Sequence, residues 1–216
     1  MLKRNSLLIR SVGLDSQVNP TAASRTLRPA CNIAMKFSPM KLNTKASRVT
    51  LKYSLLAVQV CRADYAKPEH AEALLGLLDA YARDSAGGGV PLSEFARTHL
   101  VAALAARAQA FSVLAFDGEE AVGLVNCIEG FSTFACRPLV NVHDVVVRAS
   151  HRGRRIGEQM LALVEVVARE RGACKLTLEV LSGNRGAARL YERVGFAAYQ
   201  LDPAMGQAQF LQKWLV

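Results

Sequence analysis

The sequence has no apolar run that approaches the roughly 18 to 20 residues needed by a membrane-spanning helix, and polar residues interrupt its longest uncharged stretches. Hydrophobic residues nevertheless make up 51% of the 216 positions and charged residues 21%, a composition typical of a chain that folds around a core. The missing run excludes a helical membrane protein. We therefore expect a soluble protein with no membrane partner.

Paired cysteines are also missing. The five cysteines are odd in number and widely spaced, with no Cys-x-x-Cys. This pattern fits neither a disulfide framework nor a structural zinc site, and no set of His, Cys and Asp residues has the spacing of metal ligands, so we expect no metal. Free thiols are typical of a reducing compartment, and we expect a cytoplasmic location.

Acidic residues are almost absent from the first 62 residues. This segment holds 11 of the 27 Lys and Arg residues but one of the 18 acidic residues, so its net charge is +10 and that of the remainder is −1. Because the remainder is nearly neutral, the overall charge of +9 does not indicate a nucleic-acid-binding fold, and we expect no nucleic-acid partner.

Residues 1–53 form a basic extension that we expect to be disordered, because they show no hydrophobic periodicity. Three interpretations remain open. The extension is a transit peptide, which would place the protein in an organelle; it is a basic arm that contacts nucleic acid or membrane; or it is upstream sequence read from a misassigned start.

Regular hydrophobic patterns begin at residue 54. They predict strands over 55–63, 110–116, 121–134, 138–147, 174–181, 196–201 and 208–216, and helices over 67–84, 92–108, 156–171 and 184–194. Asp117-Gly118 supplies the turn of a hairpin. The sequence thus predicts one α/β (α+β) domain over residues 54–216, with helices flanking a mixed sheet.

Positive charge and small residues concentrate between the strand that ends at Val147 and the helix that begins at Ile156. The stretch "HRGRRIGEQM" supplies both, through Arg152, Gly153, Arg154, Arg155 and Gly157. A helix N-terminus offers free N–H groups and the positive end of the helix dipole to a phosphate, glycine leaves the backbone open, and arginine pairs with phosphate oxygens. The stretch has neither a P-loop ending nor the G-x-G-x-x-G spacing. Alone, it fits a phosphate-binding loop or a solvated basic turn equally.

Two motifs in the second half resemble those of the GNAT superfamily of acyl-CoA-dependent N-acetyltransferases. "VVVRASHRGRRIGEQML" is similar to its pyrophosphate-binding motif, Arg/Gln-x-x-Gly-x-Gly/Ala, through Arg152 and Gly157. "NRGAARLYERVGF" is similar to the motif that follows, at Asn184, Ala187, Leu190, Tyr191, Gly195 and Phe196. One position departs, because Arg155 stands where the family has its first glycine. The backbone there must turn without glycine, with the side chain directed away from the phosphates or clamping them.

The resemblance implies a mixed, mostly antiparallel sheet with a V-shaped splay between two central parallel strands, where acetyl-CoA lies. Main-chain groups near Val145, Val146 and Val147 would hold the pantetheine arm as if it were an added strand. Asn184 would hydrogen-bond that arm. The full set of implied cofactor-binding residues is Val145, Val146, Val147, Arg152, Gly153, Arg154, Arg155, Ile156, Gly157, Asn184, Ala187 and Tyr191.

The same resemblance implies direct attack of an amine on the thioester in a ternary complex. Tyr191 would protonate the leaving thiolate, and the main-chain amide of Val145 or Val146 would stabilise the oxyanion. The general base stays open among His143, Asp144 and Glu179. His143 and Asp144 lie on opposite faces of one strand and cannot face the same cleft without a bulge.

The sequence says least about the acceptor substrate. Glu129, Ser132 and Thr133 suit a cationic amine, which favours a small amine or amino-acid-like acceptor, while a peptide acceptor and a homodimer stay open. A different class of function also remains, namely a non-catalytic acyl-CoA-binding module that acts as a sensor or interaction partner.

Overall fold

The computed structural model describes residues 57–84, 87–199, 202, 204, 206 and 208–215. The predicted extension, residues 1–53, and the first residues of the first predicted strand lie outside this part of the chain. All described residues belong to one compact unit, Asn43–Val216. None of the described helices is both long and apolar enough to span a membrane.

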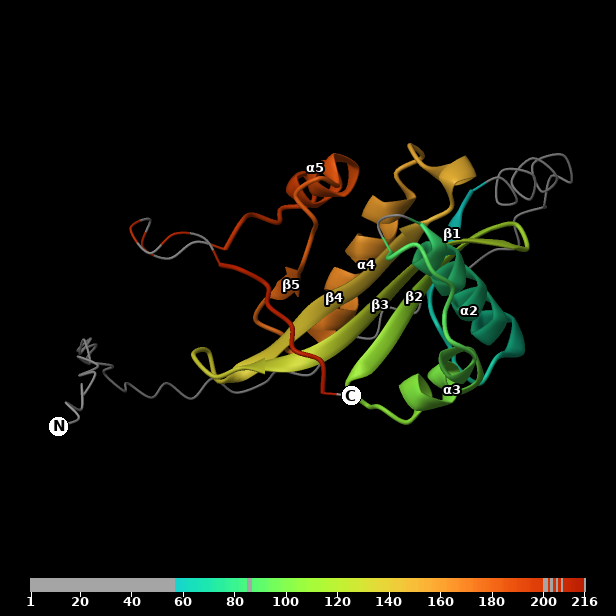
Figure 1. Cartoon of the computed structure of the whole chain (residues 1–216), viewed down its shortest axis with the longest axis horizontal. Helices are drawn as coiled ribbons and strands as arrows, with labels where there is room; N and C mark the ends of the chain where they lie inside the picture. Colours follow the sequence, from blue (N-terminus) through green and yellow to red (C-terminus); the bar gives the residue numbers. More distant parts are fainter. Residues whose placement is uncertain are drawn as a thin grey trace, which may run out of the picture. The chain divides into compact units, whose positions relative to one another are not determined.

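A five-stranded sheet forms the centre of the described unit (Figure 1). Its strands are β1 (Gln59–Arg62), β2 (Ala110–Asp117), β3 (Glu120–Ser132), β4 (Arg137–Val147) and β5 (Leu176–Leu178), in the order β1-β2-β3-β4-β5. The pairs from β1 to β4 are antiparallel, whereas β4 and β5 are parallel. The predicted mixed, mostly antiparallel sheet is therefore confirmed.

Helices cover both faces of the sheet. The helices α2 (Pro68–Arg83) and α3 (Glu94–Ala105) pack on one face, where their leucines meet those of β2 and β3. The helix α4 (Ile156–Glu170) packs on the other face and buries its apolar stripe against valines of β2, β3 and β4. The short η1 (Ala149–His151) and α5 (Arg185–Arg193) complete the described elements.

Local sequence signals explain where these elements begin and turn. Pro68 occupies the first turn of α2, where a missing N–H costs no hydrogen bond. Ser93 caps α3 by accepting a hydrogen bond from the Ala96 N–H at 3.1 Å. Gly118 provides the positive φ of the β2–β3 turn, at 64°. The predicted helices and the hairpin are confirmed.

A β-bulge interrupts β4 at His143. Asp144 pairs with Asn126 and Val142 pairs with Cys127, so His143 has no partner position on β3. The extra residue changes which face the following side chains take. Val142 packs on the α4 side of the sheet, whereas Asp144 bonds Asn126 on the α2 side, where Val146 also packs.

The parallel strands β4 and β5 separate after a short paired stretch. Val140–Val142 pair with Leu176–Leu178, and the register extends no further along the described residues. The second half of β4, up to Val147, therefore leaves its β5-facing edge unpaired in this part of the structure, as the predicted splay requires.

Two strand predictions are wrong for the residues that the structure describes. Within 196–201 and 208–216, no described residue is in a strand. A strand needs a neighbour to supply hydrogen bonds, and the described side chains of Phe210, Leu211 and Trp214 are 77%, 82% and 78% exposed. The alternation of apolar residues in these two segments was therefore not sufficient to predict strands. The strand predicted over 174–181 is confirmed only as the shorter β5, which lies at the edge of the described sheet.

Candidate active site

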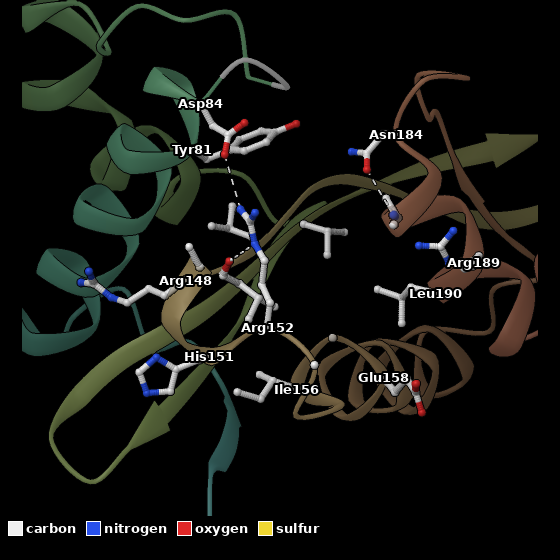
Figure 2. Close-up of a pocket in the computed structure, with 18 of the residues that line it drawn as sticks. Tyr81, Asp84, Arg148, His151, Arg152, Ile156, Glu158, Asn184, Arg189 and Leu190 are labelled. Carbon is white, nitrogen blue, oxygen red and sulfur yellow. Dashed lines mark hydrogen bonds and ion pairs between the residues drawn. The ribbon is translucent and has the colours of Figure 1, made fainter.

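A cavity of about 1430 Å³ lies between the end of β4, the loop before α4, the helix α5 and the C-terminal turn of α2 (Figure 2). Its walls bring together all but one of the residues that the resemblance implies for cofactor binding: Val145, Val146, Val147, Arg152, Gly153, Arg155, Ile156, Gly157, Asn184, Ala187 and Tyr191. The exception is Arg154. The three candidate bases are not among the lining residues.

The loop before α4 turns through two positive φ angles. Gly153 has φ +81° and faces open space, while Arg155 has φ +59° and ψ 21°. Arg155 is thus in the left-handed conformation that glycine adopts freely and that other residues adopt at a cost. Its side chain is 78% exposed, and its Nε lies 3.9 Å from Glu158 Oε2. The backbone follows the glycine path at this position although the sequence departs from the motif.

Arg154, which was expected in the cofactor set, is not among the residues that line the cavity. Its guanidinium donates to Asp117 Oδ2 at 2.6 Å, in the turn between β2 and β3. His151 Nε2 lies 3.4 Å from the same oxygen. The hydrogen bond from Arg154 is the main cause of a lowered pKa for Asp117. Arg154 therefore fastens the loop to the hairpin.

Arg152 lies in the middle of the cavity (Figure 2). Its Nε donates to the main-chain oxygen of Val147 at 3.1 Å, and its Nη2 lies 3.4 Å from Asp84 Oδ2 at the end of α2. The guanidinium thus bridges β4 and α2. An anion bound at this point would compete with Asp84 for the same charge.

Gly157 is buried at the second position of α4, where it meets α5. A Cβ built there would lie 2.8 Å from Leu190 Cδ2, closer than side chains tolerate. Asn184 caps α5, because its Oδ1 accepts from the Ala187 N–H at 3.2 Å (Figure 2). This bond leaves the side-chain amide N–H groups of Asn184 as donors beside the cavity.

Tyr191 lies on α5 and reaches the cavity wall with 9% of its surface exposed. Burial, and secondly the nearby Tyr81, raise its pKa to about 12. Its ring contacts Phe196 edge-on, with centroids 5.9 Å apart. The phenol is therefore protonated throughout the neutral range, as a proton donor must be.

The three candidate bases occupy different surroundings. His143 is exposed at the bulge. Glu179 accepts hydrogen bonds at 3.3 Å from Asn141 Nδ2, which comes from β4. Asp144 accepts at 3.0 Å from Asn126 Nδ2 on the α2 side of the sheet. The bulge at His143 is present in β4. Of the three candidate bases, Asp144 is the one that accepts a hydrogen bond on the α2 side of the sheet in the described structure.

Sequence reasoning missed the part of the site that comes from α2. Tyr81 and Asp84 line the cavity, and Arg189 lines it from α5 (Figure 2). Burial first, then Asp144 and Asp84, raise the pKa of Tyr81. Tyr81 packs against the hydrophobic core on the α2 side, and nothing local to α2 indicates that its last turn meets a loop some 70 positions later. Among the described residues no group of three or more His, Cys, Asp and Glu could hold a metal ion.

Comparisons with known proteins agree with this geometry. The model of a family described as the acetyltransferase (GNAT) family matches residues 74–196. Streptothricin acetyltransferase from Streptomyces lavendulae is 38% identical over 90 residues, which are 40% of this chain and 48% of that protein. The chain thus matches about half the length of this curated relative.

Solved structures share the fold at lower sequence identity. A transcriptional regulator from Bacillus halodurans C-125 superposes with a TM-score of 0.61 at 20% identity, covering 73% of this chain and 100% of that one. The acetyltransferase AAC(6')-Iy, solved with a CoA-linked bisubstrate analogue, superposes with a TM-score of 0.59 at 15% identity, covering 73% and 99%. Since the family model spans more than half of the sequence and the cavity collects both motifs, the chain belongs to the GNAT acetyltransferase family.

Proposed function

We propose that the protein transfers the acetyl group of acetyl-CoA to a primary amine of a small cationic acceptor, in a ternary complex of both substrates. The observation that carries this proposal is the single cavity that joins the loop before α4, the unpaired half of β4 and Tyr191. Its volume of about 1430 Å³ exceeds the roughly 300–1,000 Å³ of pockets that hold one small molecule, so a long cofactor and a second substrate fit together.

The residues present suit acetyl-CoA. The first residues of α4, Ile156 to Glu158, line the cavity, a Cβ added at Gly153 would meet no other atom within 4 Å, and Arg152 brings positive charge to the same cavity. Such a helix start binds phosphate groups. Val145 to Val147 offer main-chain groups along the edge that β5 does not pair, where an extended arm can add as a strand. Asn184 offers its amide N–H groups to that arm.

Tyr191 supplies the proton that the departing sulfur needs. The amine must lose a proton to attack; its nitrogen then forms a bond to the thioester carbon, and the carbon–sulfur bond breaks. The phenol of Tyr191 donates its proton to the thiolate and is reprotonated from the solvent, while the second proton of the attacking nitrogen leaves to solvent. The main-chain N–H of Val145 or Val146 stabilises the oxyanion that forms between these steps. Acetylated amine, free CoA thiol and one proton are the products.

A small cationic amine is the favoured acceptor. Streptothricin is the acceptor named for the relative that is 38% identical over 90 residues, and it is the first compound that we propose to test. On the α2 side of the cavity, Asp84 is already paired with Arg152, whereas Asp144 lies near Tyr81, which lines the cavity. The carboxylate of Asp144 would attract a cationic amine.

The test is a thiol-release assay of the purified full chain with acetyl-CoA against a panel of amines: streptothricin, an aminoglycoside, a polyamine, free amino acids and a peptide. We expect CoA release that depends on at least one amine, with the acetylated product seen by mass spectrometry. Calorimetric titration with acetyl-CoA is the control. Binding without any amine-dependent release would contradict the proposal and favour a non-catalytic acyl-CoA-binding module instead.

A further inference from the structure

Four polar side chains cross the α2 face of the sheet in a continuous line. Tyr65 OH lies 2.9 Å from Ser112 Oγ, Ser112 Oγ donates to Asn126 Oδ1 at 2.6 Å, and Asn126 Nδ2 donates to Asp144 Oδ2 at 3.0 Å. Ser112, Asn126 and Asp144 are direct register partners on β2, β3 and β4. We call Tyr65, Ser112, Asn126 and Asp144 the polar ladder.

Every hydrogen bond of the ladder runs toward Asp144. A charged carboxylate can only accept, so the Asn126 amide must present its nitrogen to it and its oxygen to Ser112. The Ser112 hydroxyl donates its single proton to that oxygen, so Tyr65 must be the donor in the hydrogen bond between Tyr65 and Ser112. Burial, as the main cause, raises the pKa of Tyr65, which keeps its phenol protonated for this role.

The polar ladder gives the folded state no advantage in stability over apolar side chains at the same positions. Ser112 and Asn126 are 1% and 5% exposed, at positions flanked by the apolar side chains of Leu114, Leu124 and Val146. Buried polar groups lower stability unless each is bonded, and valine or leucine would pack there without that demand. Polar residues that break a local packing rule are commonly kept for a functional site.

Asp144 is the end of the ladder that lies nearest the cavity, because it is followed directly by Val145, Val146 and Val147, which line the cavity. Its Oδ2 is held by Asn126, while its Oδ1 has no hydrogen-bond partner among the described residues. Burial is the main cause of the raised pKa of Tyr81 on α2 and of Cys127 on β3, and the charge of Asp144 is the second cause of each. Tyr81 lines the cavity and in turn contributes to the raised pKa of Tyr191. The partly exposed carboxylate of Asp144 thus lies near Tyr81, which lines the cavity and lies near the proton donor Tyr191.

We infer that Tyr65, Ser112 and Asn126 are positioning residues that hold Asp144 so that its free Oδ1 receives the ammonium group of the acceptor and takes its proton. This inference rests on the proposed function and selects Asp144 from the three candidate bases. One proton moves from nitrogen to Oδ1, which turns the ammonium into the neutral amine that attacks the thioester. The carboxylic acid then returns the proton to solvent.

The first experiment compares Asp144→Asn, Asn126→Leu and Tyr65→Phe with wild type, using the amine of the panel that reacts fastest. We expect kcat/KM to fall by about 10²-fold or more in Asp144→Asn, since general base catalysis contributes 10²- to 10⁴-fold. Asn126→Leu should fall by about tenfold and Tyr65→Phe by a few-fold, because each acts through the next bond of the ladder. Tyr199→Phe, which removes an exposed phenol, is the matched control and should react like wild type.

The pH profile separates positioning from mere packing. A hydrogen bond donated to a carboxylate favours its charged form, so its loss in Asn126→Leu should move the acid limb of kcat/KM to higher pH. Acetyl-CoA affinity should stay within about twofold in all variants, because the ladder is not part of the cavity wall. Wild-type profiles in Asn126→Leu and Tyr65→Phe, with unchanged affinity and melting temperature, would overturn the inference.

If no amine of the panel is acetylated, that result contradicts the proposed function but does not test the role of Asp144. A second measurement tests that role independently. Protein labelled with ¹³C at aspartate carboxyl groups is titrated with methylammonium chloride, and the Asp144 resonance is assigned by its loss in Asp144→Asn. We expect this resonance to shift with saturation in wild type and the response to weaken in Asn126→Leu. An Asp144 resonance that does not respond would overturn the inference.

Discussion

Tyr191 shows how the tertiary environment changes the chemistry of one side chain. A free tyrosine has a pKa of about 10, which would place an alkaline limb of the reaction within easy reach. Burial, and secondly the nearby Tyr81, raise the pKa to about 12. The phenol donates a proton only while it is protonated, so the pH at which the rate declines rises together with the pKa. We therefore expect ionisation of Tyr191 to cause no decline in rate below about pH 11.

Tyr191→Phe keeps the ring and its contact with Phe196 while removing the proton. We expect kcat to fall by about 10²- to 10⁴-fold, the usual contribution of general acid catalysis, with acetyl-CoA affinity unchanged. Steady-state kinetics and calorimetry check the two parts. A variant with wild-type kcat would assign Tyr191 to the core alone.

The same pKa shift predicts a difference in stability at high pH. A raised pKa in the folded state contributes stability that is complete below the unfolded value of about 10 and is lost as the pH rises to about 12. The melting temperature of wild type should therefore fall more steeply than that of Tyr191→Phe between pH 10 and 12. Parallel curves in thermal denaturation would show that the phenol is not buried in solution.

Arg155 carries a backbone cost that glycine would not. The left-handed conformation destabilises the folded state by about 1–2 kcal/mol for a residue other than glycine. A glycine avoids this penalty but costs about 0.5–1 kcal/mol in chain entropy on folding. We expect Arg155→Gly to be neutral or to raise the melting temperature by up to about 4 °C, with acetyl-CoA affinity retained. Arg155→Ala is the matched control, because it removes the same charge but keeps the strained φ of +59°. A loss of binding in both variants would instead assign the guanidinium to the phosphates.

At the scale of elements, the contact between α4 and α5 sets the shape of the cavity. Gly157 lets Leu190 approach, and α5 carries both Asn184 and Tyr191. Gly157→Glu should lower acetyl-CoA affinity by about 100-fold or more, since it forces the helices apart and places negative charge at the start of α4.

Gly157→Gln separates the two causes of this loss, because it has the same bulk without the charge. We expect a smaller loss than for Gly157→Glu in calorimetric titration, the difference measuring how near the phosphates lie. Equal losses would mean that packing alone is responsible. Unchanged affinity in Gly157→Glu would show that this helix start is not the phosphate site.

The elements also show which sequence signals were sufficient. Helices α2, α3 and α4 were predictable because their apolar periodicity agrees with one end signal each: Pro68 in the first turn of α2, the Ser93 cap of α3, and Gly172 after the end of α4. The last two predicted strands were not, because a strand depends on a partner that no local pattern supplies. The bulge at His143 belongs to the same class, since it exists only in the register between β3 and β4.

At the scale of the whole molecule, charge divides the chain into two parts. Residues 1–62 hold a net charge of +10 and the remainder −1, while the family match begins at residue 74. We expect deletion of residues 1–53 to leave the melting temperature and acetyl-CoA affinity unchanged and to abolish retention on a cation exchanger at neutral pH. A large fall in melting temperature would mean that the extension packs on the domain.

The sequence by itself determined the two motifs and the order of the helices and of the first five strands, because these depend on local spacing along the chain. Eleven of the twelve residues that the resemblance implies for the cofactor line one cavity, and their role in binding stays a prediction. The sequence could not assign Arg154, whose charge satisfies Asp117 from a distant turn, nor recognise Tyr81 as a wall of the cavity. The polar ladder was equally out of reach, since Tyr65, Ser112, Asn126 and Asp144 meet only through the register of three strands. Tertiary structure decided these points because hydrogen bonds and burial act between residues that are close in space, whatever their separation in sequence.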